Sequence, residues 1–161
     1  MIQRQIEILL VEDNQDDVEL TLHTLRKENL ANSIHIARDG EEALDFLFCH
    51  GIHAERAGEP PPRLILLDLK LPKVEGLEVL RRIKADERTK TIPVVILTSS
   101  KEEPDLVKGY GYGANSYIQK PVDFEQFRDT IKKVGLYWLV VNQAPVLEGL
   151  NQPAAKGAGA D

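Results

Sequence analysis

Acidic side chains stand at the ends of two apolar runs of this sequence. Glu12 and Asp13 come directly after "IEILLV", residues 6–11, and Asp68 ends "RLILLD", residues 63–68. If both runs are neighbouring strands of a parallel sheet, their carboxyl ends meet at one edge and bring the three carboxylates together. Two like charges about 4 Å apart repel by about 4 kcal/mol at an effective dielectric constant near 20. The three acids therefore need a counter-charge, and a divalent cation is the natural one.

Phosphoryl chemistry assisted by Mg²⁺ is what such a set of residues could support. Mg²⁺ prefers hard oxygen ligands and usually takes one or two carboxylates, several waters and a phosphate oxygen. Thr98 and Ser99 close a further apolar run and offer hydroxyl groups, and Lys120 follows the last run with a cation able to reach a phosphoryl oxygen. Acids, hydroxyls and a lysine are thus expected at four strand ends.

Strands and helices alternate along the chain and would position these residues. Runs of strand length cover residues 6–11, 33–37, 63–68, 93–98 and 116–119. Continuous apolar runs indicate strands that are buried on both faces, as in a parallel sheet covered by helices. Segments with helical periodicity follow each run, and right-handed crossovers between parallel strands then give an α/β fold with a doubly wound five-stranded sheet.

Capping residues mark where the helices between these strands begin. Asn14 is a candidate N-cap for the first helix, Gly40 precedes the second, and Gly76 lies inside the third. Asp123 with Gln126 forms a capping-box pattern for the last helix. Residues 50–62, "HGIHAERAGEPPP", lengthen one connection, and their prolines and glycines favour an extended stretch and a loop.

Composition and charge exclude several classes of protein. The 161 residues are about one domain, and the net charge of −6 argues against a nucleic-acid surface. No secretory signal and no apolar run of about 18 residues is present, so we expect a cytoplasmic protein without a membrane span. The single cysteine, Cys49, excludes an internal disulfide and disfavours a thiolate zinc site. The histidines have no metal-site spacing with acids or cysteines, and we interpret them as surface or core residues: His23, His35, His50 and His53.

Four motifs together resemble a known family. "VEDN", "LILLDLKLPKVEG", "ILTSS" and "YIQKP", in this order and at these distances, are similar to the receiver domain of bacterial response regulators, the CheY-like fold. The resemblance implies the flavodoxin-like strand order 2-1-3-4-5. The resemblance covers about residues 5–135, and we expect a receiver domain at residues 5–141 and a mobile tail at residues 142–161.

The resemblance also implies a role for each polar residue. Asp68 would be the phospho-acceptor, attacking a phosphoryl group carried by a histidine kinase. Asp13, Asp68 and the backbone carbonyl of Lys70 would hold Mg²⁺, with Glu12 assisting through water. Thr98 and Lys120 would bind the phosphoryl oxygens, and the peptide bond between Lys120 and Pro121 would be cis.

Signal output is implied at two further places. In the family a threonine and an aromatic residue switch together, and these positions match Thr98 and Tyr117. The apolar stretch after Val134 suggests a homodimer or a kinase contact through Leu136, Tyr137, Trp138 and Val140. The long insertion and this terminal stretch are similar to stand-alone receivers that serve phytochrome-type sensor kinases.

Other functions remain open at this point. An aspartate-nucleophile phosphohydrolase would carry a second acid two residues after the nucleophile, where this chain has Lys70. A flavin carrier would need small residues where Glu12 and Asp13 stand, because acids repel the flavin phosphate. A receiver-like module that binds a partner without phosphorylation is the third alternative. About twenty residues after Val141 are too few for a helix-turn-helix domain, so the output must be another protein.

Overall fold

A five-stranded parallel sheet forms the centre of the molecule. The structure, a computed structural model, describes residues 6–31, 33–99, 103–121 and 123–143. The strands lie in the order β2-β1-β3-β4-β5 and are parallel throughout, which confirms the expected topology. Their bounds are β1 Ile8–Val11, β2 Ile34–Ala37, β3 Leu64–Leu67, β4 Val94–Thr98 and β5 Ser116–Gln119.

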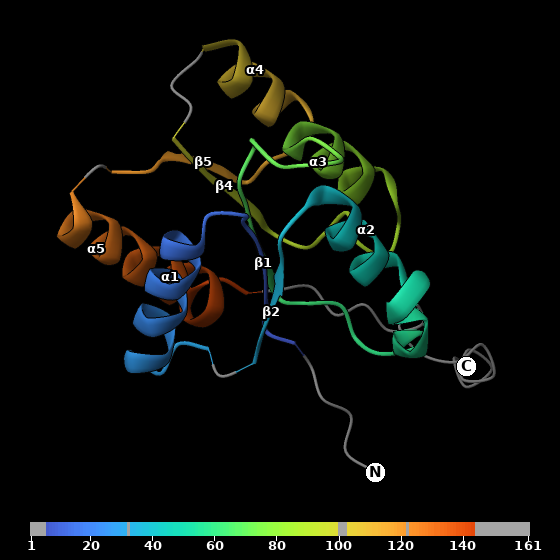
Figure 1. Cartoon of the computed structure of the whole chain (residues 1–161), viewed down its shortest axis with the longest axis horizontal. Coiled ribbons are helices and arrows are strands. Elements are labelled where there is room, and N and C mark those ends of the chain that lie inside the picture. Colours follow the sequence, from blue (N-terminus) through green and yellow to red (C-terminus); the bar gives the residue numbers. More distant parts are fainter. Residues whose placement is uncertain (1–5, 32, 100–102, 122, 144–161) are drawn as a thin grey trace.

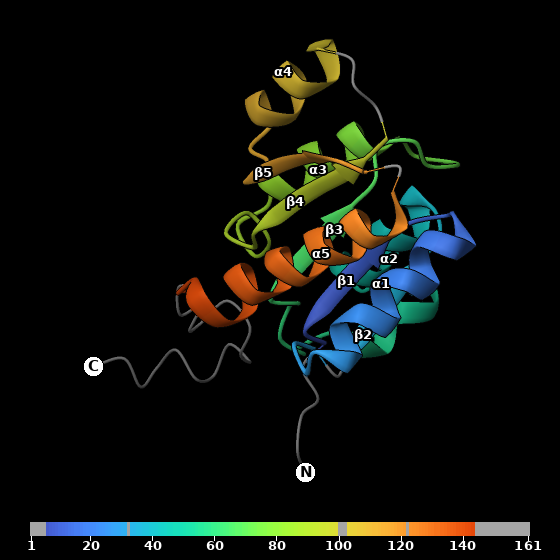
Figure 2. The ribbon, with the colours of Figure 1, turned by 90° about the vertical axis from the view of Figure 1, so that its left-hand side faces the viewer.

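Helices cover both faces of this sheet (Figures 1 and 2). They are α1 Gln15–Lys27, α2 Gly40–Phe48, α3 Gly76–Ala85, α4 Glu103–Gly111 and α5 Phe124–Gly135. Helices α1 and α5 lie together on one face, and α2 and α3 lie on the other. A short 3-10 helix, η1 Gly51–Arg56, follows α2, and a π-helical segment, η2 Leu136–Val141, continues α5.

The strand sequences explain why two apolar cores form. Side chains alternate across a strand, so Leu9 and Ile65 join the core under α2 and α3, while Ile8 and Leu64 join the core under α1 and α5. All four are buried. Strands β1 to β4 start one or two residues later than the apolar runs suggest, while β5 starts where expected. Strand β3 ends one residue before Asp68, so the acid is the first residue of the following loop.

Helix starts agree with the capping signals, with small shifts. The Asn14 carboxamide accepts a hydrogen bond from the Asp17 amide, and the Asp123 carboxylate accepts from the amides of Glu125 and Gln126. For α2 the cap is Asp39, and Gly40 is the first helical residue instead of the residue before the helix. Gly76 likewise begins α3.

The insertion at residues 50–62 differs from the expected extended loop because its first half forms η1. Arg56, at the end of η1, lies over the Phe46 ring at 3.6 Å and donates a hydrogen bond to the Phe46 carbonyl. These contacts with α2 allow a short helix where composition alone suggests a loop.

The last described helical segment, η2, packs against its own domain. Within η2, Leu139 is buried, and its carbonyl accepts a 2.7 Å hydrogen bond from Arg63, just before β3. The expected tail, residues 142–161, lies outside the described residues from residue 144 onward. No helix in the described ranges is both long and apolar enough to span a bilayer.

Candidate phosphoryl-acceptor site

Backbone hydrogen bonds between strand ends bring the expected site residues together. The Asp68 amide donates to the Val11 carbonyl at 3.1 Å, and the Glu12 amide donates to the Ala37 carbonyl at 3.0 Å. At the other side of the site, the Lys120 amide donates to the Thr98 carbonyl at 2.7 Å. The ladder of the parallel sheet therefore extends into the loops and places these side chains at one edge.

The three expected acids converge. Carboxylate oxygens of Glu12, Asp13 and Asp68 all lie within 4.8 Å of one another. Glu12 and Asp68 are 4% and 7% exposed, while Asp13 stands open to solvent. Backbone amides help to orient the two buried acids, because Asn14 donates to Glu12 at 3.2 Å and Lys70 approaches Asp68 at 3.4 Å.

The counter-charge in this structure is Lys120. Its Nζ lies 2.7 Å from Glu12 Oε1, 2.8 Å from Asp17 Oδ2 and 3.1 Å from Asp68 Oδ2. Sequence reasoning missed Asp17, which stands in the first turn of α1 and not at a strand end. Its place three residues after the candidate N-cap Asn14, in the first turn of the helix that follows this strand end, is the signal that could have placed it beside the site.

The peptide bond between Lys120 and Pro121 differs from the expectation. No cis peptide bond occurs in the described residues, so this bond is trans, the form that most X-Pro bonds adopt. The lysine nevertheless points into the cleft, because three carboxylates hold its ammonium group.

Burial and the mutual contacts of these groups shift their pKa values in opposite directions. Burial raises the pKa of Glu12 to about 7, although Lys120 opposes the shift. Burial also acts to raise the pKa of Asp68, but the Lys120 cation and hydrogen bonds from Thr98 and Glu12 outweigh it and hold that pKa below its usual range. Burial acts to lower the pKa of Lys120, and its contacts with Asp17 and Glu12 reverse this, so it is raised above its usual value. Of the two buried acids, Glu12 is therefore the one that takes up a proton first as the pH falls.

A cleft of about 440 Å³ opens onto these groups. Ser99 and Lys70 line it together with the acids, and Thr98 is fully buried, with its hydroxyl bonded to Asp68. Most of the lining residues are polar or charged, with Pro121 and Phe127 as the apolar members, and this lining can receive a small charged group.

The donor set fits Mg²⁺. Every side-chain ligand is a carboxylate oxygen, which is the class that this hard cation prefers. Four acidic side chains, Glu12, Asp13, Asp17 and Asp68, lie around the single ammonium group of Lys120. The cleft therefore holds more acidic than basic side chains, which favours a bound cation.

Tyr117 and the segment after α5 complete the residues expected from the sequence. Tyr117 is half-buried on β5, and its ring packs against the core under α2 and α3 and beside Gly109 of α4. Leu136, Tyr137 and Val140 are exposed by 47%, 49% and 63%. Trp138 is different, because it packs against the core under α1 and α5.

The sequence matches the model of one known protein family. The family model described as "Response regulator receiver domain" matches residues 8–132. The chain belongs to this family. It is therefore a receiver-type response regulator of two-component systems, with the fold that the sheet order indicates.

Two curated relatives cover most of this receiver. "Probable methanogenesis regulatory protein FilR2" of Methanothrix harundinacea is 44% identical over 86% of this chain and 86% of its own length. "Response regulator Rcp1" of Synechocystis sp. is 39% identical over 82% of this chain and 88% of its own length.

Solved structures of similar receivers have the same fold as this chain. The Mn²⁺-bound form of Rcp1 superposes with a TM-score of 0.80 at 37% identity, covering 86% of this chain and 98% of that one. The phosphorylated cyanobacterial phytochrome response regulator RcpA gives a TM-score of 0.82 at 37% identity, over 89% of this chain and all of that one. The receiver described here is thus similar to stand-alone, phytochrome-associated response regulators.

Proposed function

We propose that this receiver accepts a phosphoryl group on Asp68 from a histidine kinase and passes the signal on by contact with another protein. The observation that carries the proposal is the setting of Asp68, whose carboxylate meets Glu12 and Asp13 within 4.8 Å and Lys120 at 3.1 Å. A nucleophilic carboxylate with acids on one side and a cation on the other is suited to an incoming phosphoryl group and its metal ion.

Asp13 and Asp68 would hold Mg²⁺ together with the backbone carbonyl of Lys70, and Glu12 would contact it through water. The all-oxygen donor set and the excess negative charge of the cleft support this assignment. When bound, the ion neutralises charge on the phosphoryl oxygens and orients them.

The transfer itself needs little from the protein beyond positioning. An Asp68 oxygen attacks the phosphorus of the kinase phosphohistidine, the phosphorus–nitrogen bond breaks, and an acyl phosphate forms on Asp68. The departing imidazole keeps the electron pair of that bond and takes up a proton. Lys120 and the Thr98 hydroxyl, which contact Asp68 before transfer, turn to the new phosphoryl oxygens.

The switch belongs to the same proposal. A phosphoryl group adds about −1.5 to −2 charge units to the cleft and draws hydrogen-bond donors toward it. Thr98 lies at the end of β4, and Tyr117 lies on the neighbouring β5, where Ile96 pairs with Tyr117. A shift of Thr98 toward the phosphoryl group would open space for Tyr117 to turn inward and change the face formed by α4 and β5.

The proposal also includes the kinase partner, the location of the protein and the reactions that it would catalyse. A phytochrome-type sensor kinase is our preferred partner, because RcpA is described as a phytochrome response regulator. The cytoplasmic location belongs to the proposal, since acceptor and kinase must share a compartment. The protein would catalyse only its own phosphorylation and dephosphorylation, and neither nucleic acid nor a membrane is needed.

A homodimer through η2 is a further part of the proposal. Leu136, Tyr137 and Val140 form an exposed apolar surface next to α5, and apolar and aromatic side chains are typical of the centres of interfaces. Trp138 would support this surface from within, because it packs on its own domain. We take the receiver unit as residues 5–141.

Incubation with acetyl phosphate and Mg²⁺ tests the main proposal without the kinase. Intact-protein mass spectrometry should show the gain of one phosphoryl group, and Asp68→Asn should abolish it. Asp129→Asn is the matched control, because Asp129 is an exposed carboxylate on α5 that pairs with Lys133 and does not line the cleft. It should be labelled like the parent chain.

The same measurement separates the alternatives. No gain of mass in the parent chain would favour a binding module that works without phosphorylation. A gain that survives Asp68→Asn would place the acceptor elsewhere and overturn the assignment. Continuous hydrolysis of acetyl phosphate, with many molecules consumed per chain within minutes, would favour the phosphohydrolase.

A further inference from the structure

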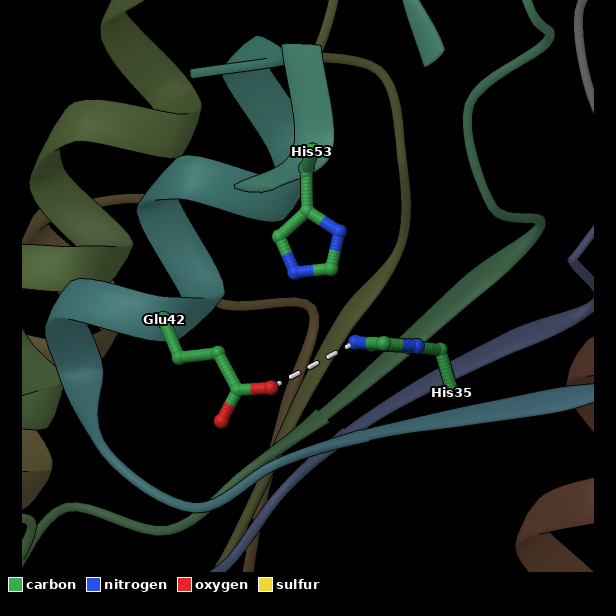
Figure 3. Close-up of side chains that lie close together, drawn as sticks. All are labelled: His35, Glu42 and His53. Atoms are coloured by element: carbon green, nitrogen blue, oxygen red, sulfur yellow. Dashed lines mark ion pairs between the residues drawn. The ribbon is translucent and has the colours of Figure 1, made fainter. Parts of the chain in front are cut away.

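Two histidines and a glutamate meet between β2, α2 and η1. His35 of β2, Glu42 of α2 and His53 of η1 offer ligand atoms that all lie within 4.8 Å of one another. Figure 3 shows the three side chains converging from three separate elements, with the His53 ring directed toward the gap between the other two. Their spacing in the sequence predicts surface or core residues, and both histidines are half-buried in the structure.

We propose that His35, Glu42 and His53 form a binding site for a borderline divalent transition-metal ion, with Zn²⁺ as the intended occupant. Two imidazole nitrogens and one carboxylate oxygen are a donor set that Zn²⁺ uses with a water as fourth ligand. This set differs from the all-oxygen cleft at Asp68, so the two sites should select different ions.

The distances favour shared ligation over hydrogen bonding. His35 Nε2 lies 3.7 Å from Glu42 Oε2, which is too long for a hydrogen bond. Two ligands each about 2.1 Å from one tetrahedral ion lie roughly 3.4 Å apart. A small inward movement of side chains would therefore convert the present spacing into coordination.

Both histidines also present an unused buried nitrogen. His35 Nε2 and His53 Nε2 are shielded from solvent and have no hydrogen-bond partner in the described structure. A buried polar atom without a partner costs free energy, and a bound ion would satisfy both nitrogens at once.

The surroundings hold the three ligands in place. The Phe46 ring stacks on His35 at 4.1 Å and meets His53 edge-on at 5.2 Å. Glu42 Oε1 accepts a hydrogen bond from the Arg38 amide at 3.1 Å, which leaves Oε2 for the ion. Such supporting contacts are typical of metal ligands.

One nearby cation opposes binding. Arg56 is close enough to His35 to help lower its pKa. Its guanidinium group lies over the far face of the Phe46 ring and pairs with Glu59 at 3.6 Å, which reduces the charge that an ion would meet. The charge of Glu42 remains to attract a divalent ion.

Equilibrium dialysis of the full chain against ZnCl₂ tests the site, with Mg²⁺ in large excess to occupy the carboxylate cleft. The parent chain should retain one equivalent of Zn²⁺. Loss of an outer-shell partner alone lowers metal affinity about 10- to 100-fold, so His53→Ala, which removes a direct ligand, should weaken binding at least about tenfold. His50→Ala is the control, because His50 is exposed and belongs to the same insertion.

A second readout covers the case in which His53→Ala fails to fold. Co²⁺ added to the parent chain should give the visible absorption of a four-coordinate site, and Glu42→Gln, which keeps the side-chain volume, should weaken or remove it. Zn²⁺ retention equal in the parent, His53→Ala and His50→Ala would overturn the proposal. So would the absence of both Zn²⁺ retention and Co²⁺ absorption in the parent chain.

Discussion

Lys120 is the residue on which the charge balance of the acceptor cleft depends. It is the single ammonium group, among the described residues, that contacts Glu12, Asp17 and Asp68 together, and all four side chains are shielded at least in part from water. Coulomb interactions are stronger there than at the surface. Removing this cation should therefore affect stability, while removing an exposed lysine should not.

Substitution of Lys120 by methionine should lower the free energy of unfolding by roughly 3 kcal/mol in the presence of EDTA, the usual cost of leaving a buried charge unpaired. Urea denaturation followed by Trp138 fluorescence provides the measurement. Lys133→Met is the control, because Lys133 pairs with Asp129 at the surface and should cost less than about 1 kcal/mol. Equal losses in the two variants would contradict the role given to Lys120.

Glu12 should make the stability of the metal-free chain depend on pH. Its pKa is raised from 4.5 to about 7 in the folded state, so between these values the folded chain binds more protons than the unfolded chain. The free energy of unfolding contributed by Glu12 therefore falls as pH rises from about 4.5 to about 7. His35, whose pKa is lowered, has the opposite effect on the pH dependence of stability. The effect of Glu12 is therefore isolated by comparing the slope of unfolding free energy against pH in the parent chain and in Glu12→Gln.

That comparison needs urea titrations in EDTA at several pH values. The difference in unfolding free energy between the parent chain and Glu12→Gln should change across this range, with the parent losing stability relative to the variant as pH rises. A difference that stays constant with pH would show that Glu12 titrates normally in the folded chain.

At the scale of elements, the start of α3 lies directly against the acceptor loop. A Cβ added to Gly76 would clash with the carbonyl oxygen of Asp68 and lie 2.6 Å from Leu69 Cα. The Gly76 amide also donates to the Leu69 carbonyl at 2.9 Å. The position of the acceptor backbone therefore depends on having no side chain at this helix terminus.

Gly76→Ala should destabilise the protein by roughly 1–3 kcal/mol, as overpacking does, and should slow labelling by acetyl phosphate because the Asp68 backbone must move. Gly111→Ala is the matched control, since an added Cβ there meets nothing within 4 Å. It should be neutral or stabilise by less than about 1 kcal/mol. Similar behaviour of the two variants would contradict the packing argument.

Much of the sheet and of the site could be predicted because apolar runs end at polar residues, and strand ends in a parallel sheet gather at one edge. Asp17 could not be predicted this way, because it reaches the cleft from a helix. The cluster of His35, Glu42 and His53 depends on η1, a short helix within residues 50–62 whose Arg56 contacts Phe46 of α2, and this tertiary contact cannot be read from local sequence. The trans bond before Pro121 departs from the family expectation, and the ion pairs of Lys120 hold its side chain in the cleft.

On the scale of the whole molecule, η2 extends the receiver beyond its last long helix and exposes an apolar surface. A dimer through this surface should make the elution volume in gel filtration correspond to two chains. Leu136→Asp should shift it to one chain, because a charge in an apolar interface is costly. Phe124→Asp is the control, because Phe124 is 65% exposed at the opposite end of α5.

Two outcomes would contradict the dimer. The parent chain could elute as a monomer at every concentration, or Leu136→Asp and Phe124→Asp could shift the peak equally. Trp138→Ala is less informative, because Trp138 packs on its own domain and its loss should lower stability as well.

The convergence of Glu12, Asp13 and Asp68 on one divalent cation is the claim on which the proposed phosphoryl transfer rests, and a Mn²⁺ titration followed by electron paramagnetic resonance tests it most directly. Mn²⁺ prefers oxygen ligands like Mg²⁺, so it should report on this cleft and not on the histidine cluster. One Mn²⁺ should bind per parent chain and be displaced by Mg²⁺. Asp13→Asn should weaken Mn²⁺ binding at least about tenfold. The control is Asp16→Asn, which changes an exposed neighbour on α1 and should bind Mn²⁺ like the parent chain. Unchanged Mn²⁺ binding in Asp13→Asn, or no binding in the parent chain, would contradict the account.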